Sequence, residues 1–170
     1  MAILKIVPSE RYTVEGAINY ITDIPYHEGR VSYYDGIKLD PYHAARDMLL
    51  AKKISGATTR SQYKHIVISL EIGERLEYDN ERMLFSEIGD YIACETGCQV
   101  VFAIHENTKH SHCHFVINSV KLTNNRKLNI SFQMLRRLRK TISDILIKYG
   151  AKPILGMEGI NLENNAVIMQ

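Results

Sequence analysis

The chain contains few cysteines and no long apolar run. Its three cysteines, Cys94, Cys98 and Cys113, are an odd number without the spacing of a disulfide framework, so we expect reduced thiols in a reducing compartment. No signal peptide opens the sequence, and no apolar stretch is long enough to cross a membrane. We also find no internal repeat and no low-complexity segment. Together these absences predict a cytoplasmic protein that does not interact with membranes.

Net charge is also small, at +2 for 170 residues, and by itself excludes little. Its distribution is more informative, because the segment 121–152 has nine basic residues and a single acid, Asp144. Such local basic charge is expected of a surface that binds phosphate groups. A solvated helix face is the common alternative. The candidate phosphate contacts are Lys121, Arg126, Lys127, Arg136, Arg137 and Lys140.

Length and composition suit one globular domain with a single core, since 45% of the residues are hydrophobic and 24% are charged. The order of strands and helices favours an α+β fold with a largely antiparallel central sheet. We expect the helices to pack on one face of this sheet. The segment 26–40 contains Gly29, Gly36 and few apolar residues, and is predicted to be a loop. Expected strands are 3–7, 64–70, 99–105, 112–120 and 126–130, and expected helices are 14–24, 41–55, 79–95 and 131–149.

Four of the seven histidines lie between residues 105 and 114. His112 and His114 are two residues apart in a predicted strand, so both point from the same face of the sheet. His105 ends the preceding strand, and if the two strands form a hairpin the three imidazoles converge. Three neutral imidazoles around an open position form a metal site that can still accept a substrate oxygen. Solvated surface histidines are the alternative, but three on one face favour the metal site.

The other polar residues of this segment allow more than one role. His110 lies between the two strands and could bind phosphate, transfer a proton or have no function. Glu106 and Asn107 follow His105 and could orient a ligand histidine or simply lie on the surface. The metal is not fixed by the ligands, because all-imidazole sites suit zinc or manganese whereas magnesium prefers oxygen.

The segment from His105 to Asn118, which continues as Ser119-Val120, resembles the third motif of conjugative relaxases of the MOBP class. These enzymes are HUH endonucleases, named for a histidine–hydrophobic–histidine triplet that is His112-Cys113-His114 here. Residues 17–21 (AINYI) are similar to the first motif, which contains the nucleophilic tyrosine. Residues 65–69 (HIVIS) look like the second motif, a strand that ends near a serine. The resemblance covers nearly the whole chain, and we expect a relaxase domain at 1–156 and a tail at 157–170 that could begin a linker.

The resemblance implies an enzyme that nicks one DNA strand at the origin of transfer of a plasmid or integrative element. A tyrosine attacks the scissile phosphate, remains joined to the 5′ phosphate, frees a 3′ hydroxyl and can later rejoin the strand. Implied partners are origin DNA, as a single strand with an inverted-repeat hairpin, relaxosome accessory proteins and the coupling protein of a type IV secretion system. The implied metal is Mn²⁺ or Mg²⁺, with Zn²⁺ as an alternative, on His105, His112 and His114.

Tyr20 is the nucleophile that the resemblance implies, and Tyr26 is the second choice. Tyr20 lies off the apolar stripe of its predicted helix, so it need not be buried. A phenol with a pKa of about 10 is a weak nucleophile at neutral pH, and nearby positive charge would lower that pKa. Tyr26, Tyr33 and Tyr34 could also stack on bases of a single strand. His65 and Asn118 are possible accessory residues, as is His110.

The chain departs from the family pattern after the first histidine of the third motif. The family often has an aspartate two residues after that histidine, where this chain has Asn107. Glu106 is the candidate replacement, as the acid that deprotonates the tyrosine or orients a ligand.

Two alternative functions fit part of the pattern. A rolling-circle replication initiator shares the histidine pair but usually has its tyrosine on a later helix, where this chain offers only Tyr149 on an apolar stripe. A DNA-binding module that does not cleave would not need an intact triplet and Tyr20.

Overall fold

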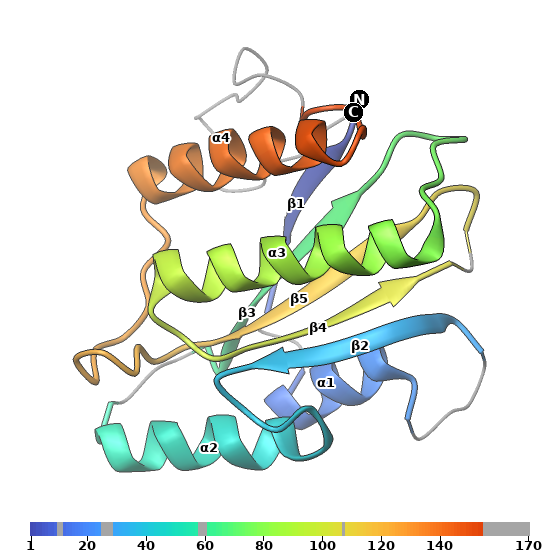
Figure 1. The fold of residues 1–170 in the computed structure, drawn as a ribbon. Coiled ribbons are helices and arrows are strands. Elements are labelled where there is room, and N and C mark those ends of the chain that lie inside the picture. Colours follow the sequence, from blue (N-terminus) through green and yellow to red (C-terminus); the bar gives the residue numbers. More distant parts are fainter. Residues whose placement is uncertain (10–11, 25–28, 58–60, 107, 155–170) are drawn as a thin grey trace.

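A five-stranded antiparallel sheet in the order β1-β3-β5-β4-β2 forms the centre of the molecule (Figure 1). The structure is a computed structural model that describes residues 1–9, 12–24, 29–57, 61–106 and 108–154. Its strands are β1 (Ile3–Val7), β2 (Val31–Ile37), β3 (Tyr63–Ser69), β4 (Val100–His105) and β5 (His112–Asn118). Its helices are α1 (Val14–Thr22), η1 (Pro41–His43, a 3₁₀ turn), α2 (Ala44–Ser55), α3 (Tyr78–Thr96) and α4 (Phe132–Lys148).

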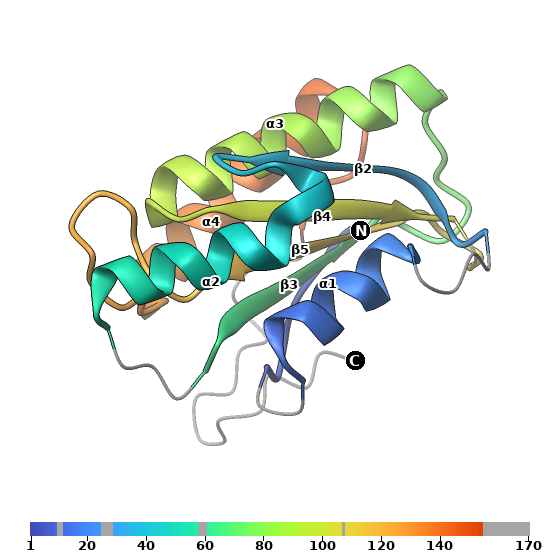
Figure 2. The same cartoon turned by 90° about the horizontal axis from the view of Figure 1, so that it is seen from below.

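The α+β class and the antiparallel sheet are confirmed, but the structure corrects the expected placement of the helices. Helices α3 and α4 cover one face of the sheet, whereas α1 and α2 cover the other (Figures 1 and 2). The physical reason lies in β4 and β5. Beside their histidines they present Val101, Ala103 and Val116, which are fully buried against α1 and α2. The histidine-bearing face is therefore half apolar and needs a cover of its own.

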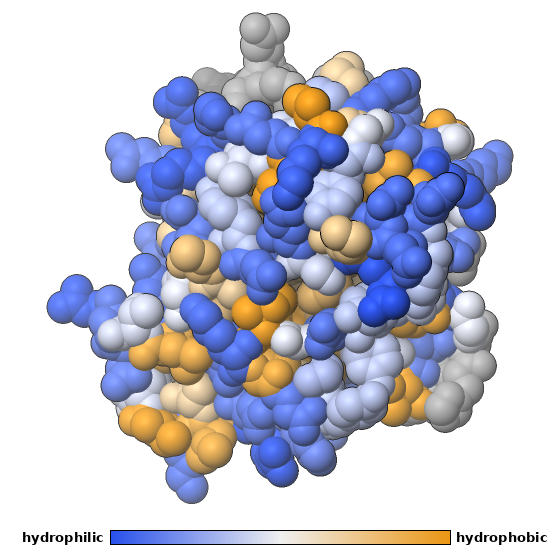
Figure 3. Space-filling view, in the orientation of Figure 1, coloured by the Kyte–Doolittle hydropathy of each residue, from blue (hydrophilic) through white to orange (hydrophobic). Residues whose placement is uncertain are grey.

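The face under α3 and α4 holds the larger core, built around Phe85, Phe102 and Phe115. The surface over these two helices is mostly hydrophilic (Figure 3). Apolar side chains gather instead in the region of α2, whose exposed apolar residues are Leu49, Leu50 and Ile54. Within the described ranges, no helix combines the length and the apolar character that a membrane span requires.

The prediction of a loop over 26–40 is wrong for residues 31–37, which form the edge strand β2 paired with β4. Valine, isoleucine and two tyrosines give this segment a strand composition, despite its few aliphatic residues. Gly36 packs closely within it, because a Cβ atom there would overlap Cδ1 of Leu39 and lie 3.1 Å from the Leu39 carbonyl oxygen, so that Leu39 would have to move. The expected strand at 126–130 is also wrong, since only a single bridge joins Val120 to Lys127.

Helix α1 is fixed at both ends, and its ends position the residues discussed below. The Thr13 side chain accepts a hydrogen bond from the Gly16 amide at its N-terminus. Asp23 forms its C-cap in the left-handed conformation, with a φ of 57°. The predicted apolar stripe of Val14, Ala17, Ile18 and Ile21 is buried, so α1 lies firmly across the sheet at the end of β4.

Candidate active site

Strand pairing brings the three predicted metal ligands together. His105 on β4 lies directly opposite His112 on β5, and His114 follows two residues later on the same face. The ring centroids of His105 and His114 are 4.5 Å apart, and those of His112 and His114 are 5.1 Å apart. One nitrogen from each ring lies within 4.8 Å of the other two. This spacing suits three ligands of one divalent metal ion.

Hydrogen bonds orient two of the three rings for metal binding. The Nδ1 atom of His114 lies 2.9 Å from Nε2 of His65. The Nε2 atom of His114 is buried and has no hydrogen-bond partner among the described residues. Nε2 of His105 donates to the carbonyl oxygen of Ile21 at 2.6 Å, which leaves the Nδ1 lone pair for a ligand. A buried imidazole nitrogen without a partner is costly. The donor set therefore fits a metal ion better than it fits an empty apolar contact.

Burial keeps these imidazoles neutral, the form that binds metal ions. Desolvation, together with a smaller contribution from the neighbouring His105, lowers the pKa of His114 to about 2. Desolvation likewise lowers the pKa of His65 to about 4, with a smaller contribution from His105. Burial also lowers the pKa values of His105 and His112. The predicted accessory residue His65 thus lies behind His114 as a neutral hydrogen-bond partner, in the place where a metal-binding histidine commonly has a carboxylate, a backbone carbonyl or a water molecule.

Tyr20 stands beside the histidines and remains accessible. Its ring centroid lies 5.9 Å from that of His114 and 6.4 Å from that of His105. The residue is 47% exposed, because it projects from α1 off the buried stripe, as the sequence predicted. A strand that reached the histidines could therefore contact the phenol.

An ion pair that the sequence analysis missed lies next to Tyr20. Nη2 of Arg30 donates to Oδ1 of Asp23 at 2.9 Å, and the Arg30 Cζ atom lies 5.4 Å from the centroid of the Tyr20 ring. Asp23 is three residues after Tyr20, and that spacing was the only hint in the sequence. Arg30 lies in the segment that was predicted to be a loop and gave no signal.

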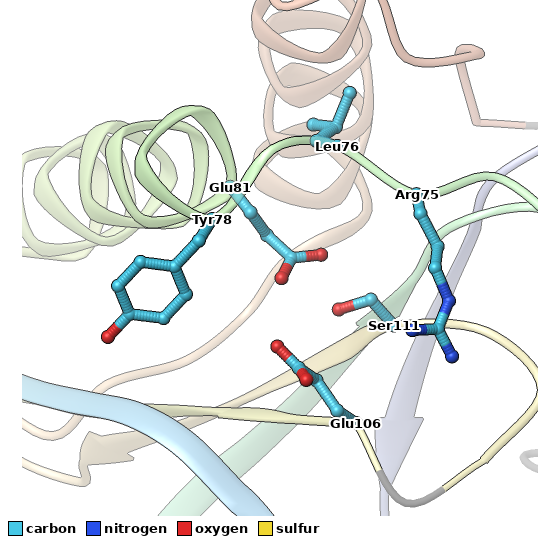
Figure 4. A pocket seen from close by; sticks show the side chains of 6 residues that line it. All are labelled: Arg75, Leu76, Tyr78, Glu81, Glu106 and Ser111. Atoms are coloured by element: carbon cyan, nitrogen blue, oxygen red, sulfur yellow. The ribbon is translucent and has the colours of Figure 1, made fainter.

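The structure does not bring Glu106 to Tyr20. Glu106 follows β4, and its carboxylate points toward Glu81 of α3 in a pocket that Arg75 and Ser111 also line (Figure 4). This pocket lies on the α3 face of the sheet, because strand alternation sends residue 106 to the side opposite His105. Asn107 and Tyr26 lie outside the described residues.

Of the other predicted accessory residues, Asn118 lies away from the three ligands and His110 lies next to His112. Asn118 is buried at the far end of β5, where its amide donates to the carbonyl oxygen of Met48 and to Gln99. His110 lines a separate pocket with Ile3 and Leu70, although its ring centroid is only 6.0 Å from that of His112. Tyr149 bonds through its hydroxyl to Glu87 of α3, on the opposite side of the sheet from the histidines.

The predicted basic residues also lie away from the histidines. Arg136, Arg137 and Lys140 belong to α4, on the other face of the sheet (Figure 1), and Arg137 and Lys140 pair with Glu95 and Asp144. The remaining three follow the C-terminal end of β5, whereas His112 begins that strand. These are Lys121, Arg126 and Lys127.

Comparisons with known proteins agree with this geometry. Residues 20–151 match the relaxase family described as MobA/VirD2-like, nuclease domain. No curated protein sequence matches the chain. A solved structure of the MobM relaxase domain (MOBV), bound to manganese and to origin-of-transfer DNA of plasmid pMV158, aligns with a TM-score of 0.67 at 11% identity. That alignment covers 98% of this chain and 95% of the other.

A second structure, described as the molecular basis of vancomycin resistance transfer in Staphylococcus aureus, aligns with a TM-score of 0.62. The two chains are 16% identical over 88% of this chain and 92% of the other. At such identities the two structures show a shared fold. The family match covers most of the chain, and the chain therefore belongs to the MobA/VirD2-like relaxases, with residues 20–151 corresponding to their nuclease domain.

Proposed function

We propose that this chain nicks one DNA strand at an origin of transfer, with Tyr20 as the nucleophile and a divalent metal ion on His105, His112 and His114. The observation that carries the proposal is the half-exposed phenol of Tyr20 beside the three-histidine cluster. The fold shared with MobM, which was solved with manganese and origin DNA, supports both the metal and the substrate.

The histidines can serve this reaction because they are neutral and fixed in direction. A metal ion held by them would neutralise charge on the phosphate oxygens of the scissile bond. His65 and the Ile21 carbonyl hold the rings of His114 and His105 in place through hydrogen bonds. Helix α1 covers this side of the sheet and limits the water that reaches the cluster.

Tyr20 supplies the covalent step. Its Oη atom attacks phosphorus and forms an Oη–P bond, while the bond between phosphorus and the 3′ oxygen breaks. The phenol loses its proton, and the leaving 3′ oxygen takes one up as a hydroxyl. The 5′ phosphate remains on Tyr20. Because the ester keeps the free energy of the broken bond, the same 3′ hydroxyl or another can reverse the reaction and join strands.

The wider interactions stay predictions. The six basic residues at 121–127 and on α4 lie away from the histidine cluster, so we expect them to contact DNA that flanks the nick. Relaxosome accessory proteins and a coupling protein of type IV secretion are the expected protein partners. The domain boundary near residue 156 is likewise a prediction, since residues 155–170 lie outside the described part of the chain.

Covalent capture tests the proposal directly. The purified protein is incubated with Mn²⁺ and a single strand that carries the origin of its own element, labelled at the 3′ end. The label should move with the protein on a denaturing gel, because the downstream fragment is the one joined to Tyr20. Tyr20→Phe should abolish the adduct, and so should the double change His112→Ala plus His114→Ala.

Tyr149→Phe is the matched control, because it removes the same hydroxyl from the opposite side of the sheet. It should leave the adduct unchanged. Absence of any adduct from the wild type would refute nicking. Loss of the adduct in Tyr149→Phe, with retention in Tyr20→Phe, would instead favour a rolling-circle replication initiator, in which the tyrosine follows the histidines in the sequence.

A further inference from the structure

An acidic residue near the nucleophile is present in this chain, although position 107 has an asparagine. Asp23 is only 5% exposed and caps α1 in the left-handed conformation, three residues after Tyr20. Aspartate tolerates that conformation better than most residues do. A carboxylate buried to this degree needs a charged partner, and Arg30 provides it.

Two contacts tie Arg30 to Asp23. The guanidinium donates from Nη2 to Oδ1 at 2.9 Å, and the Arg30 backbone amide donates to Oδ2 at 3.4 Å. The arginine side chain is 19% exposed. It is therefore held largely out of solvent, with Cζ 5.4 Å from the Tyr20 ring centroid.

Arg30 supplies positive charge beside Tyr20. A guanidinium is cationic at every relevant pH, and the guanidinium of Arg30 lies over the Tyr20 ring. The planar fork of a guanidinium also matches phosphate oxygens.

We infer that Arg30 binds the scissile phosphate beside Tyr20 and that Asp23 is the positioning residue that holds it there. The inference rests on the proposed nicking activity and adds a substrate contact to it. The competing explanation is a purely structural ion pair that fastens the end of α1 to the start of β2. The two explanations differ in whether Arg30 responds to the charge of the phosphate.

A neutral phosphate analogue measures that response. The nick is first mapped with an unmodified strand, and a methylphosphonate is then placed at the scissile position, which removes the negative charge. The second-order rate of adduct formation is measured for both strands. Arg30→Gln should lower the rate on the unmodified strand by roughly 10- to 100-fold, the effect of losing one charged hydrogen bond.

The methylphosphonate penalty is the ratio of the rate on the unmodified strand to the rate on the methylphosphonate strand. It should be smaller in Arg30→Gln than in the wild type by about the same factor, because glutamine has no positive charge to interact with the phosphate charge. Intrinsic reactivity of the analogue cancels in this comparison. Arg30→Lys should keep part of the discrimination, and Asp23→Asn, which retains the side-chain shape, should show an intermediate penalty. Arg75→Gln, which removes the same charge on the α3 face, should match the wild type.

Each outcome decides between the explanations. If the wild type forms no adduct with the unmodified strand, the proposed function fails before Arg30 is tested. If the wild type forms the adduct but Arg30→Gln keeps the full methylphosphonate penalty, the ion pair is structural and the inference is wrong. A full penalty in Asp23→Asn alone would overturn the positioning role of Asp23.

Discussion

Replacing His65 by phenylalanine tests the support of the metal centre without touching a ligand. His65 lies on β3, 7% exposed, with its Nε2 atom 2.9 Å from Nδ1 of His114. When His114 offers Nε2 to a metal ion, its Nδ1 must carry the proton and donate to His65. Phenylalanine fills the space but accepts no hydrogen bond. The metal-bound state then holds a buried N–H group without a partner.

The size of the effect follows from that lost partner. A buried donor without an acceptor costs about 1–3 kcal/mol, and loss of such a support typically weakens metal binding by about 10- to 100-fold. A factor of 10 corresponds to about 1.4 kcal/mol, so the two estimates agree. His65→Phe should therefore bind Mn²⁺ about 10- to 100-fold more weakly than the wild type.

Calorimetric titration with Mn²⁺ at neutral pH measures this change, and circular dichroism checks the fold of each variant. His65→Gln is the matched control, since its amide oxygen can accept from His114, and its affinity should stay within about tenfold of the wild type. The reasoning is refuted if His65→Phe is folded and binds Mn²⁺ as tightly as the wild type.

The remaining predictions concern stability and DNA binding. Burial lowers the pKa of His65 to about 4 in the folded chain, from about 6.5 in the unfolded chain. Between these two pH values His65 is therefore protonated in the unfolded chain and neutral in the folded chain. Urea unfolding with EDTA should show stability falling as pH decreases from about 6.5 to 4, by about 3 kcal/mol for this residue, and His65→Gln should flatten the slope. Gly97 and Gly56 both have positive φ, but a Cβ on Gly97 would lie 3.1 Å from Thr123 Oγ1 whereas Gly56 has open space. Gly97→Ala should therefore lower the free energy of unfolding more than Gly56→Ala, which should cost about 1–2 kcal/mol; equal losses would show that Thr123 adjusts freely. Replacing the predicted basic residues of α4 by glutamine should reduce the salt dependence of binding to a long hairpin substrate, yet leave the adduct with a short strand unchanged, and a large loss on the short strand would mean that DNA crosses to that face.

Local patterns predicted the histidine cluster well. Alternation along two strands is a property of covalent geometry, so the common face of His105, His112 and His114 could be worked out before their pairing was known. The buried stripe of α1 and its cap at Thr13 are similar local signals, although only the stripe was predicted from the sequence. In each case the determining residues are within a few positions of one another.

Relations between distant segments were harder to predict. Glu106 was the expected acid because it precedes Asn107, where the family often has an aspartate, yet adjacent residues of a strand point to opposite faces, and the structure turns it toward Glu81. Arg30 reaches Tyr20 only because β2 pairs with β4, and a half-buried edge strand has no strong apolar alternation to reveal it. Single-sequence patterns contain no information on such pairings.

Helix α1 links the two halves of the proposed chemistry. Its buried stripe covers Val101 and Ala103 beside the histidines, and that burial keeps the imidazoles neutral. The carbonyl oxygen of Ile21, one residue after Tyr20, accepts the hydrogen bond that orients His105. A displacement of α1 would therefore move the nucleophile and disturb a metal ligand at the same time. Because the imidazoles contribute no charge, the proposed reaction would need a metal ion and Arg30 to neutralise the phosphate, with Asp23 holding Arg30 at the end of this same helix.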